Sequence, residues 1–205
     1  LPGTLLAHYL QVGRAAGLRA RPERKHPTPL KLPVNEAVRS TADSQPGRIC
    51  VVAHMFYPDM GGEIAGWLNN IPFPFDLLVS TDTEEKRLEL EQTLAGIRSL
   101  NRLDVRVVEN RGRDIAPLLI TFGSRILDYD FCLHIHSKKS PHSSETAGWF
   151  DFLMTHLLHS GQYVRSLLNE FVRDGRLGAF YPPPFPPIER HMHRAGTFNT
   201  ARTLM

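Results

Sequence analysis

The sequence predicts an α/β fold in which helices cover both faces of a mostly parallel β-sheet, giving three layers. From residue 48 onward, short β-branched runs alternate with segments of helical periodicity, in the order β-α-β-α-β-α-β-α-α-β. This alternation is typical of parallel strands joined by helical crossovers. The 205 residues are 41% hydrophobic and 22% charged, which is the composition of an ordinary globular domain.

The chain divides into three regions by composition. Apolar residues on one helical face predict a helix over 4–16, so we expect a short helical element at residues 1–19. Residues 20–47 are rich in proline and basic residues and predict a linker. The α/β domain takes residues 48–205, and its C-terminal end could be truncated. No apolar run approaches the ~20 residues that span a bilayer, and no signal-peptide pattern opens the chain, so we expect a cytoplasmic location.

The strands are predicted from apolar runs of strand length that are rich in β-branched residues. The first and fourth runs contain the two cysteines, Cys50 and Cys132, which we interpret as buried thiols and not as a disulfide framework. The runs lie near residues 49–56, 76–80, 104–109, 130–136 and 177–182.

Helices are predicted between these runs from apolar spacing and capping residues. In residues 61–71 apolar side chains recur at i, i+3, i+4 and i+7. The stretch STDTEE offers Asp82 or Thr83 as an N-cap, and the glutamates after it suit the positive end of a helix dipole. Further helices are expected from about Asp114, with Pro117 in the first turn, and near 145–159 and 161–173.

Polar residues gather where the predicted strands end. Ligands bind beyond the carboxyl ends of the strands in open parallel sheets, so we expect a binding site at this edge. The residues placed there are His54, Tyr57 and Asp59; Ser80, Thr81 and Asp82; Asn110, Arg111, Gly112, Arg113 and Asp114; and His134, His136, Ser137, Lys138 and Lys139.

The motif NRGRDIAP places two arginines around a glycine just before a helix start. Free N–H groups at a helix N-terminus attract anions, and the arginine fork suits phosphate. Gly112 allows a tight turn or a close approach to a ligand. We therefore interpret Arg111 and Arg113 as phosphate ligands. The alternative is that they are solvated surface charges, with Asp114 serving as the helix cap.

The motif HIHSKKS places His134 and His136 on one face of a strand. Two imidazoles could bind zinc, but zinc needs a third or fourth ligand, which only the fold could supply from Asp82 or His54. We favour hydrogen-bonded histidines that line a polar cleft.

The basic residues have two interpretations. Lys138 and Lys139 are either a solvated turn or the groups that neutralise a diphosphate. A formal net charge of +3 does not by itself indicate a nucleic-acid partner, and we expect none.

The stretches VVENRGRDIAPLL and YDFCLHIHSKKS together resemble the core signature of the rhamnan synthesis protein F family. Members of that family are implicated in assembling rhamnose-containing cell-wall and lipopolysaccharide polymers. The resemblance extends roughly from Arg48 to Pro182. The opening AHYLQVGRAAGLRARP resembles a short helical element found beside domains of large polysaccharide-synthesis proteins.

A wider resemblance is to A-type glycosyltransferases. The stretch FDLLVSTDTEE is similar to the strand and helix that hold the nucleoside there, with Asp82 at the corresponding place. The stretch NRGRD is similar to an Asn-Gly segment that opens a later helix. In those enzymes an Asp-x-Asp motif holds the metal ion, and His134-Ile135-His136 stands in its place here. Imidazoles are poor magnesium ligands, so either basic side chains neutralise the diphosphate without a required cofactor or a different metal binds.

These resemblances imply a glycosyltransferase that moves a deoxysugar such as rhamnose from a nucleotide-diphosphate donor, dTDP-rhamnose or similar. The acceptor would be a glycan or a lipid-linked glycan, with peripheral association at the inner-membrane assembly machinery. We expect His136 and Asp114 to be catalytic and no metal ligands. The donor-binding residues would be His54, Thr81, Asp82, Asn110, Arg111, Gly112, Arg113, His134, Lys138 and Lys139.

Two other classes of function stay open. The first is a non-catalytic nucleotide- or glycan-binding module of a larger polysaccharide synthase, which the missing Asp-x-Asp favours. The second is a His-x-His metal hydrolase, which zinc with an open coordination position would distinguish.

Overall fold

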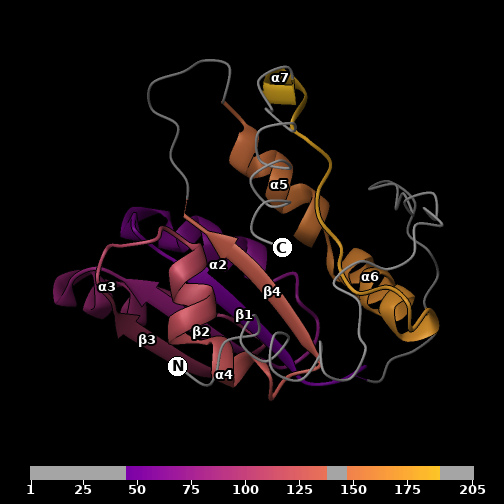
Figure 1. Ribbon diagram of the computed structural model, residues 1–205, viewed down its shortest axis with the longest axis horizontal. Helices are drawn as coiled ribbons and strands as arrows, with labels where there is room; N and C mark the ends of the chain where they lie inside the picture. The colour runs from indigo at the N-terminus through magenta and orange to yellow at the C-terminus, as the bar shows by residue number, and fades with distance from the viewer. Residues whose placement is uncertain (1–44, 138–146, 190–205) are drawn as a thin grey trace, which may run out of the picture.

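The strands of the described part of the chain form one four-stranded sheet, in which every neighbouring pair of strands is parallel (Figure 1). The structure is a computed structural model that describes residues 45–137 and 147–189. The strand order is β3-β2-β1-β4. The strands are β1 (Ile49–His54), β2 (Phe75–Thr81), β3 (Leu100–Val107) and β4 (Phe131–His136). The predicted parallel α/β fold is therefore confirmed.

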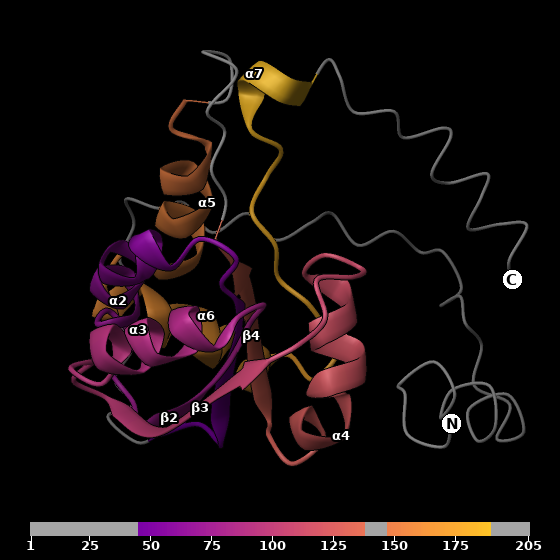
Figure 2. The ribbon, with the colours of Figure 1, turned by 90° about the vertical axis from the view of Figure 1, so that its left-hand side faces the viewer.

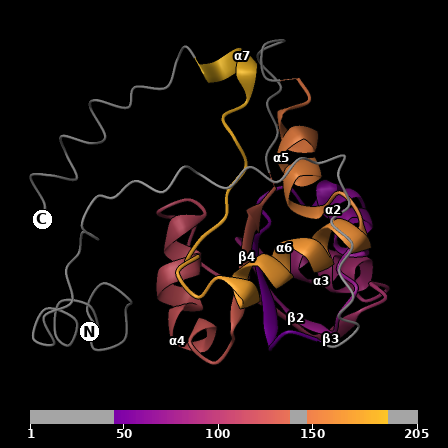
Figure 3. The same cartoon turned by 90° about the vertical axis from the view of Figure 1, so that its right-hand side faces the viewer.

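Helices cover the sheet on both faces, so the molecule has three layers (Figures 2 and 3). The two covers are unequal in size, since four helices pack on one face and a single helical segment packs on the other. The first cover comprises α2 (Gly61–Leu68), α3 (Glu84–Leu94), α5 (Trp149–Leu158) and α6 (Gly161–Arg173). The second comprises the π-helical η3 (Pro117–Thr121) and α4 (Gly123–Ile126); the short η2 (Pro58–Met60) and α7 (Pro186–Glu189) complete the elements.

The main core lies between the sheet and the four helices. Alternate residues of the central strands, such as Val51 and Leu77, point to this side and are fully buried. Ile64 of α2 and Leu90 of α3 pack against them, which accounts for the i, i+3, i+4 spacing read from the sequence. Met154 of α5 extends the same core.

The opposite face of the sheet holds a smaller apolar cluster. Cys50, Val52 and Leu78 are buried there beneath Phe122, which stands between η3 and α4. Polar residues share this face with the cluster. His54, for example, lies two residues after Val52, and side chains two apart in a strand project to the same side. The face covered by η3 and α4 is therefore the one that carries the polar strand ends.

Several predicted elements differ from the structure. Strand β3 begins at Leu100, four residues before the predicted start, and the helix expected from about Asp114 is a π-helix from Pro117 followed by α4. Residues 177–182 do not form a strand; the prolines that follow lack the N–H groups that a sheet ladder needs. Cys132 is exposed, not buried, because β4 is an edge strand of the described sheet.

Other predictions lie wholly or largely outside the described residues. They are the helical element at 1–19, the part of the predicted linker (20–47) that precedes residue 45, the residues Lys138 and Lys139, and the end of the domain beyond residue 189. Within the described ranges, none of the helices has the length and apolar character that a bilayer crossing requires.

Truncating Phe122 should test the cover on the polar face. Phe122 is fully buried, so Phe122→Ala should lower the free energy of unfolding by about 3–5 kcal/mol. Ile120 in the same segment is 75% exposed, and Ile120→Ala should change it by less than about 0.5 kcal/mol. Urea titration of both variants measures the difference; equal effects would show that η3 and α4 do not pack on the sheet as described.

Candidate functional site

The carboxyl ends of the three adjacent strands β2, β1 and β4 meet in one row. His54 of β1 is the register partner of Ser80 in β2 and of His136 in β4. Partners in a parallel ladder point to the same face, and here that face is the one covered by η3 and α4. His134 lies two residues before His136 and so projects to the same side. The fold thus brings together residues that are far apart in the sequence.

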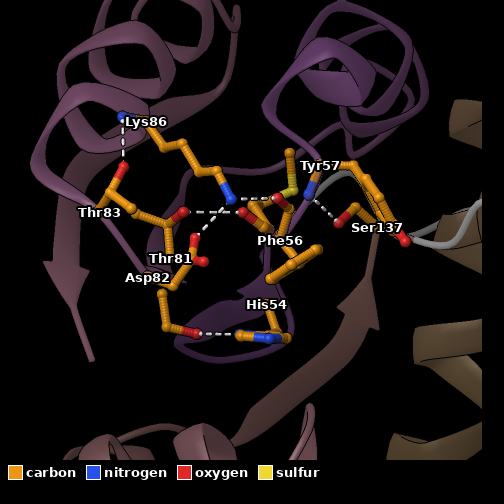
Figure 4. A network of polar contacts seen from close by, with 10 residues as sticks. His54, Phe56, Tyr57, Thr81, Asp82, Thr83, Lys86 and Ser137 are labelled. Carbon is orange, nitrogen blue, oxygen red and sulfur yellow. Dashed lines mark hydrogen bonds and ion pairs between the residues drawn. The ribbon is translucent and has the colours of Figure 1, made fainter. Parts of the chain in front are cut away.

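His54 is the most enclosed of the histidines that the structure places at this edge. It is 8% exposed, and its Nδ1 lies 2.9 Å from Oγ of Ser80, which is fully buried (Figure 4). Burial lowers the pKa of His54, although the charges of Asp114 and Asp82 oppose the shift. The imidazole is therefore neutral at pH 7 and can either donate or accept through the ring nitrogen that does not face Ser80.

Asp114 faces the two histidines of β4. Its Oδ2 lies 3.9 Å from Nε2 of His134 and 3.7 Å from Nδ1 of His136, distances that exceed a hydrogen bond. Nε2 of His134 is buried and has no hydrogen-bond partner within the described parts of the chain. Burial lowers the pKa of His134 despite the nearby Asp114 carboxylate. A carboxylate between two imidazoles is an arrangement that can bind or move a proton.

The loop that presents Asp114 has an unusual backbone. Gly112 and Arg113 both have positive φ angles, of 75° and 53°. A side chain at position 112 would put Cβ 2.5 Å from Cβ of Ala116, so only glycine fits there. A left-handed arginine costs of order 1–2 kcal/mol, and strain of this kind concentrates at binding and catalytic sites. The turn carries the chain from β3 over the ends of β1 and β4.

Lys86 is a residue of this edge that the sequence interpretation missed. Its Nζ lies 2.6 Å from Oδ1 of Asp82 and 3.0 Å from the carbonyl oxygen of Phe56, and it stands 4.1 Å from the centre of the Phe56 ring (Figure 4). A lysine in the first turn of α3 is unfavourable to the helix dipole, and Asp82 offsets this. The i, i+4 spacing of Asp82 and Lys86 was the available signal.

Hydroxyl groups fix the loop that follows β1. Thr81 is fully buried and donates to the carbonyl oxygen of Met55 at 2.9 Å, so its hydroxyl joins β1 to β2. Ser137 accepts from the backbone N–H of Tyr57 at 3.0 Å (Figure 4). Thr83, not Asp82, is the cap of α3, since its side chain accepts from the N–H of Lys86 at 3.4 Å. Asp82 is thereby left to pair with Lys86.

The remaining predicted residues lie on the rim or beyond the described chain. Asn110, Arg111 and Arg113 are exposed in the loop after β3, next to Asp114. Lys138 and Lys139 fall outside the described residues. In the part of the chain that the structure describes, no three His, Cys, Asp or Glu side chains are arranged to hold a metal ion. The described edge therefore offers imidazoles, two carboxylates and basic side chains, but no metal-ligand set.

The fold and this edge define the class of the molecule: a parallel α/β domain with a polar site at the carboxyl ends of its strands. Its sequence matches the profile of the family described as rhamnan synthesis protein F over residues 25–203. The chain belongs to the rhamnan synthesis protein F family, which associates it with polysaccharide biosynthesis.

Curated relatives come from Xanthomonas campestris pv. campestris. The chain is 32% identical over 135 residues to the uncharacterized protein WxcX of strain B100 and to the WxcX protein of strain ATCC 33913. The match covers 65% of this chain and 19% of each relative, so the chain spans about a fifth of the relatives' length. No solved structure matches the chain.

The neutral state of His54 should make stability depend on pH. Because folding lowers the pKa of His54, its imidazole takes up a proton more readily in the unfolded chain than in the folded protein. The free energy of unfolding therefore falls as the pH drops below the ordinary histidine pKa near 6.5. His54→Asn, which keeps a side-chain nitrogen near Ser80, should lose less stability than the wild type between about pH 7.5 and 5.5. Urea titrations at both pH values measure the free energy of unfolding of each protein. The control is His159→Asn, at an exposed position, which should lose as much stability as the wild type. Identical losses in all three proteins would show that His54 is not held neutral.

Proposed function

We propose that this domain binds a nucleotide-diphosphate sugar at the carboxyl edge of its sheet and transfers the sugar to a growing glycan. The observation that carries the proposal is the row formed by His54, Ser80 and His136, with Asp114 beside it, in a chain of the rhamnan synthesis protein F family. A deoxysugar such as rhamnose, delivered as dTDP-rhamnose or a similar donor, agrees with the family. The acceptor would be a glycan or a lipid-linked glycan at the inner-membrane assembly machinery.

The donor would lie across the strand ends with its nucleoside at Asp82. Lys86 occupies Oδ1 of Asp82, so Oδ2 is the oxygen we assign to a hydroxyl or N–H group of the nucleoside. The diphosphate would then lie toward the exposed Arg111 and Arg113, whose planar forks match phosphate oxygens. Lys138 and Lys139 come two and three residues after the end of β4 in the sequence and would add further positive charge.

The transfer step would use His136 as the base. As the acceptor hydroxyl attacks the anomeric carbon, its proton passes to the imidazole, and the bond from that carbon to the phosphate oxygen breaks with its electron pair on the diphosphate. The side chain of His136 is 37% exposed and so can reach a ligand. Asp114 would close its 3.7 Å gap to His136 once the donor is bound and stabilise the imidazolium that forms.

A non-catalytic nucleotide- or glycan-binding module of a larger synthase is the second candidate. Two observations favour it: His-x-His stands in place of a metal-holding Asp-x-Asp, and the chain spans about a fifth of its curated relatives. Such a module would bind the same ligand at the same edge without turnover. A His-x-His metal hydrolase has less support, because the described residues supply no third ligand.

Arg113 should contribute more than Arg111 to the affinity for the donor. Arg113 lies in the strained turn directly before Asp114, so Arg113→Ala should weaken binding of UDP or dTDP by about 1.5–3 kcal/mol. Arg111→Ala should weaken it less, and Arg102→Ala, near the start of β3, should leave it unchanged. Isothermal titration calorimetry measures each affinity. Equal affinities of wild type and Arg113→Ala would remove this arginine from the site, and no heat at millimolar nucleotide would remove the donor itself.

Donor binding should not require a divalent metal. Metal normally meets the charge of the leaving diphosphate, and here the exposed Arg111 and Arg113 would supply positive charge at the same edge. The affinity for the donor in excess EDTA should stay within about threefold of the affinity in millimolar magnesium or manganese, a difference under ~0.7 kcal/mol. A tenfold loss under chelation would instead indicate a metal-bound donor.

A further inference from the structure

The two cysteines are direct partners in the sheet. Cys50 of β1 pairs in register with Cys132 of β4, and partners in a parallel ladder project to the same face. Each thiol shifts the pKa of the other, as expected of two sulfur atoms that lie near one another. The proposed donor chemistry uses neither thiol, and the sequence interpretation treated both as buried thiols that do not form a disulfide framework.

The spacing of paired strands suits a disulfide. Neighbouring strands lie ~4.7–4.9 Å apart, and the Cα atoms of a disulfide are usually ~4.4–6.8 Å apart. Formation of the bond therefore requires side-chain rotation and little movement of the backbone. A cross-strand link of this kind, with one of its two cysteines exposed, belongs to the labile and reversible class.

The two thiols differ in reactivity. Cys50 is fully buried, and its contact with Cys132, followed by burial, raises its pKa. Cys132 is exposed, so a dissolved reagent can reach it, and the neighbouring Cys50 lowers its pKa. The thiolate is the reactive form of cysteine, so Cys132 is the attacking group and Cys50 is the resolving one.

We propose that Cys50 and Cys132 form an oxidative modification site, at which a low-molecular-weight disulfide such as oxidised glutathione converts the two thiols into a cross-strand disulfide. The Cys132 thiolate attacks oxidised glutathione, one glutathione leaves, and a mixed disulfide forms. The Cys50 sulfur loses its proton to solvent and attacks the Cys132 sulfur, and the second glutathione leaves. Two protein thiols are oxidised, and one glutathione disulfide is reduced to two thiols.

The disulfide would lock the part of the sheet that carries the histidines. The pair lies before the row of strand ends, on the same face of the sheet. Every second pair of the ladder projects to this face, and the successive pairs on it are Cys50–Cys132, Val52–His134 and His54–His136. Oxidation would therefore fix the spacing of β1 and β4 beneath the imidazoles. The proposal stands independently of donor binding, since it rests on the register of the two cysteines alone.

The test is to treat the reduced, folded chain with oxidised glutathione and to follow its intact mass and its non-reduced peptide map. Wild type should lose two hydrogen atoms, yield one cross-linked peptide pair and return to the reduced form with dithiothreitol. In guanidinium the second step, in which the mixed disulfide closes to the cross-strand disulfide, should be at least about tenfold slower, because a long flexible loop then separates the two thiols.

Single variants identify the role of each thiol. Cys50→Ser should stop at a glutathione adduct on Cys132, and Cys132→Ser should stay unreacted because Cys50 is buried. The proposal is overturned if the wild-type product is a stable single adduct, if the only disulfide joins two chains, or if both thiols remain free. Since the readout is chemical, the result does not depend on whether the domain binds a nucleotide sugar.

Discussion

The site depends on the register between β1 and its two neighbours. That register puts His54, Ser80 and His136 in one row at the carboxyl edge of the sheet. A slip of one residue in β4 would turn its histidines to the opposite face and place Ile135 beside His54 instead. The buried alternate residues of all three strands prevent this slip, because Val51, Leu77 and Ile135 must face the helices of the main core. The hydrophobic pattern and the polar site are thus fixed by the same constraint.

The segment from the end of β3 to β4 is anchored to the second face of the sheet at two places. Away from the site, Arg125 of α4 pairs with Asp104, and the Tyr129 hydroxyl donates to Asp76 at 2.6 Å. In the middle, Phe122 fills the small apolar cluster. The strained turn at Gly112 and Arg113 therefore lies at the start of a segment that these contacts fix on the sheet. This explains how a loop residue such as Asp114 is placed within 4 Å of two strand residues.

Local features could be predicted from the sequence, whereas contacts between residues far apart in the chain could not. Strand β1 and a helix cap at Asp82 or Thr83 follow from short-range patterns, and the structure assigns the cap to Thr83. The gathering of polar residues at the strand ends follows from parallel topology. The contact of His54 with Ser80 spans 26 residues and depends on register, which no local pattern carries. Helix propensity did not predict the π-helix at Pro117, and the exposure of Cys132 depends on the position of β4 at the edge of the described sheet.

The central claim is that a nucleotide sugar is bound by the histidine row at the carboxyl edge. Nitrogen NMR of the imidazole side chains, followed as dTDP or UDP is added, tests it most directly. The account requires the His54 and His136 resonances to move together with one saturation curve, while His159, exposed at the end of α5, stays in place. Movement at His159 alone, or no movement of His54 and His136 at a nucleotide concentration that saturates the protein, would contradict it.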